Sequence, residues 1–231
     1  MAGPIDLNQP APIRDAATLI VVRHAANGAS VLMGQRNSGA IFMPGKFVFP
    51  GGAVDRSDAD IPLAIRDETA TALSMDSTSD PRSLAAAAIR ELWEETGQII
   101  GTRGDWPDAP PDWQGFAATG YRPDATPLSF FFRAVTPGGR PRRVDARFFL
   151  ASATALCTDP DDFTHADDEL SHLQWIRLSN ARQFDLPFIT QVVLAELQAH
   201  LANPDAPYAP PFFRNDDEAL LVQRLGGRSP L

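Results

Sequence analysis

Apolar runs along the chain predict a series of β-strands. The runs ATLIVVR (17–23) and ASVLMGQR (29–36) are typical of two buried strands, and Asn27 with Gly28 between them favours a hairpin turn. The segment KFVFPGG (46–52) predicts a short strand that runs into two glycines. Further strands are expected at 128–136, 143–151 and 173–178.

Apolar residues with helical spacing predict two longer helices, over 83–96 and 188–202. Ser83 is expected to cap the start of the first helix, and Gly97 stands where the chain should leave it. Some helix is also expected around 61–75. Strands and helices therefore alternate along the chain, which favours a mixed α/β domain.

Two segments are expected to be loops. Residues 101–115 are rich in Pro and Trp, and residues 158–169 carry six acidic residues and no Lys or Arg. The strands and helices before, between and after these loops predict one α/β domain over 17–202. An irregular lead-in (1–16) precedes it, and an extension (203–231) that we expect to pack on the domain follows it.

The composition of this 231-residue chain excludes some classes of binding partner. The 29 acidic and 20 basic residues give a net charge of −9, which argues against nucleic acid as a partner. No apolar run approaches the ~18 residues of a membrane helix, so no membrane partner is expected. Cys157 is the only cysteine, which fits a reducing compartment, and we expect a cytoplasmic protein with Cys157 buried.

The helix over 83–96 carries an unusual set of charges near its end. At 100° per residue, Glu91, Glu94 and Glu95 fall within about 100° of one another, opposite the apolar face. Such like charges repel in water, so helix stability does not require them. A divalent cation such as Mg²⁺ would convert the repulsion into a binding site, and Arg90 could hold Glu94 in place. The alternative is a solvated acidic face.

The stretch from Arg90 to Gly97 reads R-E-L-W-E-E-T-G, and it resembles the second half of the Nudix box. That box is G-x5-E-x7-R-E-U-x-E-E-x-G-U, where U is a bulky aliphatic residue. Gly52 stands at the first glycine, and Asp58 stands where the first glutamate would be. On these positions the chain is identified as a member of the Nudix hydrolase family over roughly 17–200.

The chain departs from the box in three ways. Asp58 replaces a glutamate, and Asp55 or Glu68 could instead take its role. The gap between Asp58 and the helix arginine holds 31 residues where the box has seven, so we expect an insertion at about 59–82. Gln98 occupies the final aliphatic position.

The resemblance implies a Nudix-type α/β/α sandwich with a mixed β-sheet and a catalytic loop-helix-loop. It also implies hydrolysis of a phosphoanhydride bond by water, assisted by Mg²⁺ or Mn²⁺. The metal ligands would be Glu91, Glu94, Glu95 and the carbonyl of Gly51. Arg90 would orient a glutamate.

The general base in this family is a box glutamate or an acid from a later loop. Glu169 is the candidate loop acid, and the alternative is that it is one solvated acid among six. Arg36 could bind a substrate phosphate through its guanidinium, or it could be a surface arginine. Together with Arg36, Gly51 and Gly52 are expected to lie against the ligand.

The segment 31–52 is similar to a Nudix subgroup related to coenzyme A diphosphatases. The expected partner is therefore a small nucleoside diphosphate derivative: coenzyme A or an acyl derivative, ADP-ribose or a dinucleotide. A homodimer is a possible assembly. Two alternatives are a non-catalytic Nudix domain that senses a nucleotide, and an interaction protein that docks a partner through its Pro-rich tail (203–213).

Overall fold

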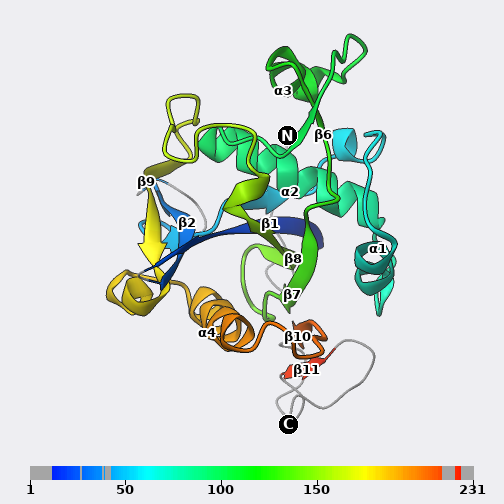
Figure 1. Ribbon diagram of the computed structural model, residues 1–231. Coiled ribbons are helices and arrows are strands. Elements are labelled where there is room, and N and C mark those ends of the chain that lie inside the picture. The colour runs from blue at the N-terminus through cyan, green and yellow to red at the C-terminus, as the bar shows by residue number, and fades with distance from the viewer. Residues whose placement is uncertain (1–11, 27, 38, 40–42, 215–221, 225–231) are drawn as a thin grey trace.

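The computed structural model describes residues 12–26, 28–37, 39, 43–214 and 222–224, and its centre is a mixed nine-stranded sheet (Figure 1). The strand order is β11-β10-β7-β8-β1-β2-β3, with β4 also paired to β1 and β9 to β2. Strands β1 and β8 run parallel, whereas β1 and β2 run antiparallel. The nine strands are β1 (Ile13–Ala25), β2 (Gly28–Arg36), β3 (Phe47–Val48), β4 (Gly51–Ala53), β7 (Ser129–Val135), β8 (Arg143–Ser152), β9 (Leu170–Arg177), β10 (Pro211–Phe213) and β11 (Val222–Arg224).

Helices cover both faces of this sheet, and β1 shows why. Leu19 and Val21 point into the hydrophobic cluster under helix α2 (Pro81–Thr96). Ile20 belongs to the other cluster, under helix α4 (Phe188–Ala202). A strand that is buried on both faces is continuously apolar rather than alternating, as the run over 17–23 is. The expected α/β sandwich with a mixed sheet is confirmed.

Helix α2 has a well-defined start and end. The side chain of Asp80 caps it by accepting the backbone N–H of Ser83 at 2.8 Å, and Pro81 is its first residue. The expectation that Ser83 is the cap was therefore wrong, since the aspartate three residues earlier accepts the free N–H group. Gly97 ends the helix with φ +71, a left-handed conformation that glycine adopts without strain.

Most expected strands and the second long helix are confirmed, with β1 beginning earlier than expected. The helix expected around 61–75 is the shorter α1 (Asp67–Ser74). Strand β1 pairs with β2 up to Ala25 and Gly28, while Asn27 lies outside the described residues. In the C-terminal extension, β10 pairs in parallel with β7. No helix in the described part of the chain has the length and apolar character needed to cross a bilayer.

The expectation of a loop over 101–115 was wrong, whereas 158–169 is a loop as expected. The segment 101–115 contains strand β5 (Gly101–Arg103) and a short 3-10 helix, and it leads into α3 (Gln114–Ala118). Strand β5 pairs with β6 (Tyr121–Pro123) in a separate small sheet above α2 (Figure 1). Trp113 is fully buried there and packs edge-on against the ring of Phe116, which gives this segment a core of its own. Cys157 is exposed rather than buried.

We expect Asp80→Ala to lower the free energy of unfolding by about 1 kcal/mol, because the N–H of Ser83 loses its acceptor. Thermal denaturation should show a melting temperature lower by about 2–4 °C. Asp80→Asn keeps an acceptor and should lose less than half as much. Equal losses in the two variants would contradict the capping role.

Candidate active site

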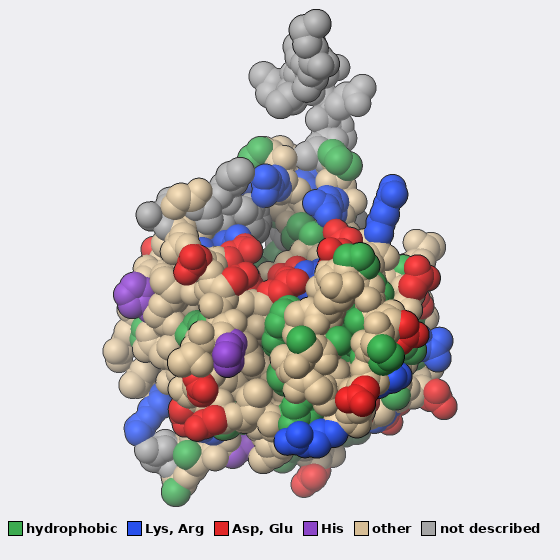
Figure 2. Space-filling view, turned by 90° about the horizontal axis from the view of Figure 1, so that it is seen from above, with side chains coloured by type: hydrophobic (Ala, Val, Ile, Leu, Met, Phe, Trp, Pro, Cys, Tyr) green, Lys and Arg blue, Asp and Glu red, His purple; other side chains and the backbone are tan. Residues whose placement is uncertain are grey.

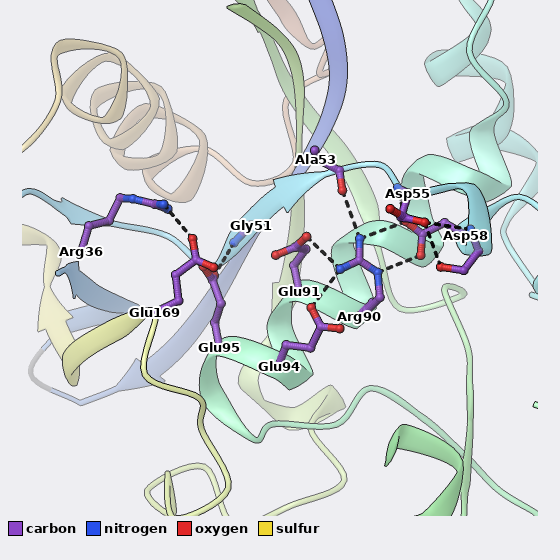
Figure 3. A network of polar contacts seen from close by, with 11 residues as sticks. Arg36, Gly51, Ala53, Asp55, Asp58, Arg90, Glu91, Glu94, Glu95 and Glu169 are labelled. Carbon is purple, nitrogen blue, oxygen red and sulfur yellow. Dashed lines mark hydrogen bonds and ion pairs between the residues drawn. The ribbon is translucent and has the colours of Figure 1, made fainter. Parts of the chain in front are cut away.

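Arg90 lies near the end of α2 at the centre of a network of ion pairs (Figure 3). Its Nε and Nη2 donate to the two oxygens of Asp58, at 2.9 and 3.0 Å. Its Nη1 donates to Glu91 and to Glu94, both at 2.9 Å, and Nη2 also donates to the carbonyl of Ala53 at 3.0 Å. These contacts use all five N–H groups of the guanidinium. Arg90 thus holds two helix carboxylates and is itself held by Asp58.

Asp58 makes this contact although it is one methylene shorter than glutamate. Its side chain is fully buried, and its Oδ2 also accepts the N–H of Asp55 at 2.8 Å. Asp55 caps the following turn, and Glu68 pairs with Arg66 at the surface. Of the three acids considered from the sequence, the structure therefore brings Asp58 to Arg90.

Gly51 and Gly52 of strand β4 lie directly against the helix carboxylates. The N–H of Gly51 donates to Oε2 of Glu95 at 2.7 Å. At Gly52, an added Cβ would lie 2.4 Å from Oε1 of Glu91, so no larger residue fits without moving that carboxylate. The two glycines thus allow the backbone to approach both side chains closely.

Glu95 is the most deeply buried of the helix carboxylates, with 1% of its surface exposed. Its Oε2 accepts the Gly51 N–H, whereas its Oε1 is buried and has no hydrogen-bond partner among the described residues. Burial, and next the charge of Glu91, raise the pKa of Glu95 well above its usual range. A buried carboxylate oxygen without a partner is unfavourable in the isolated protein, and a cation would relieve it.

The other two carboxylates are also perturbed. Burial raises the pKa of Glu91 to about 7. The positive charge of Arg90 opposes this increase, and the negative charge of Glu94 adds to it. Burial also raises the pKa of Glu94, which is more exposed than Glu91. Carboxyl groups that lie together and have raised pKa values are typical of functional sites.

Glu169 reaches this site from the far end of the acidic loop (residues 158–169). Its Oε1 accepts from Nη2 of Arg36, on β2, at 2.7 Å. Figure 3 shows its carboxylate beside Glu95, and its charge contributes to the raised pKa values of both Glu91 and Glu95. The structure thus brings together Glu169, Arg36 and the helix carboxylates, which are far apart in sequence.

Asp167 also belongs to this neighbourhood, although nothing in the sequence distinguishes it from the other acids of the loop. Its backbone N–H donates to the carbonyl of Glu94 at 2.8 Å, and its charge raises the pKa of Glu94. Burial raises the pKa of Asp167 itself, and the charge of Glu169 adds to this effect. The hydrogen bond from the backbone N–H of Glu169 opposes it. The signal was the run of six acids, but the run alone does not say which of them face the helix.

The donor set suits a hard divalent cation, because it consists of carboxylate oxygens beside a backbone strand. In the described part of the chain, no three acidic, His or Cys side chains are arranged as a ready metal cluster. The reason is visible in Figure 3, where Arg90 holds Glu91 and Glu94 while Glu95 turns toward Gly51. The unpartnered oxygen of Glu95 nevertheless fits a cation ligand. Figure 2 shows acidic side chains gathered near the centre of the face seen from above.

Two known proteins are similar to this chain. The crystal structure of a Nudix hydrolase from Alicyclobacillus acidocaldarius is 30% identical, covers 85% of this chain and 94% of that chain, and has a TM-score of 0.62. A curated Caenorhabditis elegans protein named as a nudix hydrolase is 28% identical over 176 residues, which is 71% of this chain and 51% of the relative. The chain therefore spans about half the length of that curated relative. No family model matches the chain.

The raised pKa values predict how Glu95→Gln changes stability. In the folded protein Glu95 keeps its proton at pH values where the unfolded chain has lost it. The contribution of this protonated side chain to the free energy of unfolding is therefore complete below about pH 4.5. It is lost as pH rises through the raised pKa. Without metal, Glu95→Gln should match the wild type at pH 5 and melt about 2–6 °C higher at pH 8.

Thermal denaturation in a chelator at both pH values measures this difference. Adding Mg²⁺ at pH 8 should raise the melting temperature of the wild type and leave Glu95→Gln nearly unchanged. An equal difference in melting temperature between the two proteins at pH 5 and pH 8 would contradict a raised pKa of Glu95.

Proposed function

The chain belongs to the Nudix hydrolase family, and on that premise we propose that it is a metal-dependent pyrophosphohydrolase. Its substrate is a nucleoside diphosphate linked to another moiety, and the bond that breaks is the phosphoanhydride. The observation that carries this proposal is the set of buried carboxylates at the end of α2. Glu95 has a buried oxygen with no hydrogen-bond partner among the residues that the structure describes, and Arg90 holds Glu91 and Glu94 beside it.

A divalent cation, Mg²⁺ or Mn²⁺, would be held by Glu91, Glu94, Glu95 and the carbonyl of Gly51. When bound, it neutralises phosphate charge and makes water more acidic. Arg90 positions Glu91 and Glu94 from the side and does not touch substrate, because all five of its N–H groups are used within the protein. Gly52 has no side chain and so leaves room for the carboxylate of Glu91.

Glu169 acts as the general base. Water attacks phosphorus, its proton passes to the carboxylate of Glu169, and the bond from phosphorus to the bridging oxygen breaks as the new P–O bond forms. The position of Glu169 supports this role, since it lies at the site on a loop rather than in the Arg90 network (Figure 3). Its contact with Arg36 holds the carboxylate near the helix.

Arg36 binds a phosphate of the substrate. Its Nε is buried and has no hydrogen-bond partner in the described part of the chain, although Nη2 is paired with Glu169. A guanidinium in this state has donors left for a phosphate oxygen. The substrate is coenzyme A or an acyl derivative, ADP-ribose or a dinucleotide, and these share the diphosphate that Arg36 and the cation would contact.

We expect the wild type to release nucleotide or phosphate from at least one member of a panel in the presence of Mg²⁺. The panel contains coenzyme A, ADP-ribose, NADH, diadenosine polyphosphates and nucleoside triphosphates. The double variant Glu94→Gln/Glu95→Gln should lose at least about 100-fold in kcat/KM, because both side chains are ligands. Glu68→Gln, a matched change at the surface, should leave activity unchanged.

Chromatographic product analysis checks these outcomes and locates the bond that is cut. Full activity in the double variant would sink the mechanism. Tight binding of a diphosphate by calorimetry, with no turnover of any panel member, would instead indicate a sensor domain.

A further inference from the structure

Gln98 lies directly after the end of α2, at the position where the Nudix box has a bulky aliphatic residue. Gln98 is fully buried. A buried amide is unfavourable unless its donors and its acceptor are hydrogen-bonded. The partners of this side chain therefore show why a polar residue is stable in an apolar position.

All three side-chain hydrogen bonds of Gln98 go to the acidic loop. Its Nε2 donates to the carbonyls of Asp159 and Asp162, at 3.0 and 2.7 Å. Its Oε1 accepts from the hydroxyl of Thr158 at 2.7 Å. One amide thus uses both of its N–H groups and its oxygen to fix the first five residues of the loop against the end of α2.

The loop returns to the same helix one turn earlier. The N–H of Asp167 donates to the carbonyl of Glu94 at 2.8 Å, and Oδ1 of Asp167 accepts the N–H of Glu169, also at 2.8 Å. Glu94 lies in the last turn of α2 and Gln98 just beyond the end of the helix, so the two residues hold the two ends of the loop at the same end of α2. Glu169 follows directly, beside Glu95 and paired with Arg36 (Figure 3).

We propose that Gln98 is a positioning residue, whose side-chain amide fixes the acidic loop so that Glu169 lies beside the helix carboxylates. The inference rests on the proposed function, in which Glu169 accepts the proton of water. An aliphatic side chain would fill the same space, but it would leave two carbonyls and one hydroxyl without their partner. The loop would then move to expose these groups to water, and Glu169 would move with it.

The test compares Gln98→Met, Thr158→Val and the control Gln198→Met in steady-state kinetics on the best substrate of the panel. Gln198 also donates an amide hydrogen bond to a backbone carbonyl, but on α4, under the opposite face of the sheet. We expect Gln98→Met to lower kcat by about 10–100-fold with KM within about twofold. Thr158→Val removes one of the three bonds together with the acceptor of the Ile99 N–H, and it should show a smaller loss. The control should show none.

A double-variant cycle separates positioning from a general structural role. In the Glu169→Gln background the loop acid is already gone, so Gln98→Met should lower kcat by less than about twofold. A full additional loss in that background would mean that Gln98 acts without Glu169 and would overturn the inference. Unchanged kcat in Gln98→Met would also overturn it.

Thr158→Val decides the question if Gln98→Met does not fold, because it leaves the buried amide in place. Unchanged kcat in that variant then counts against the inference. A wild type without activity on the whole panel is a different result, since it refutes the proposed function and the inference with it. Wild-type activity that Gln98→Met retains refutes the inference alone.

Discussion

The guanidinium of Arg90 is the constraint on which the rest of the site depends. Burial and mutual repulsion favour the protonated forms of Glu91 and Glu94, and the guanidinium between them opposes both effects. Arg90 can do this because Asp58, almost without exposed surface, fixes it through two hydrogen bonds. Arginine suits this place better than lysine, since its five N–H groups lie in a rigid plane.

The site is arranged at the expense of stability. Glu95 has no cationic side chain within hydrogen-bond distance in the described part of the chain, and the negative charges of Glu91 and Glu169 act on its carboxyl group. Such a group favours the protonated form in the isolated protein and favours ionisation once a cation arrives. Binding of the metal would therefore release protons and stabilise the fold. A destabilised, buried donor set of this kind binds a charged ligand more strongly than a solvated acidic surface does.

The sequence predicts the fold well where one local pattern decides the structure. The run over 17–23 and the helix over 188–202 are such cases, and Arg90 to Gly97 locates the helix carboxylates. It fails at contacts between distant segments. Nothing near Gln98 indicates that its amide would meet the acidic loop, and Asp58 could not be separated from other acids until the insertion was placed.

The most direct test of this account is a crystal structure with Mn²⁺, with the metal located by its anomalous scattering. We expect a peak within about 2.0–2.3 Å of Oε1 of Glu95 and within reach of Glu91 and Glu94, with Arg90 still paired to Asp58. A peak at other residues, or none at saturating Mn²⁺, would contradict the assignment of these buried carboxylates as the metal site.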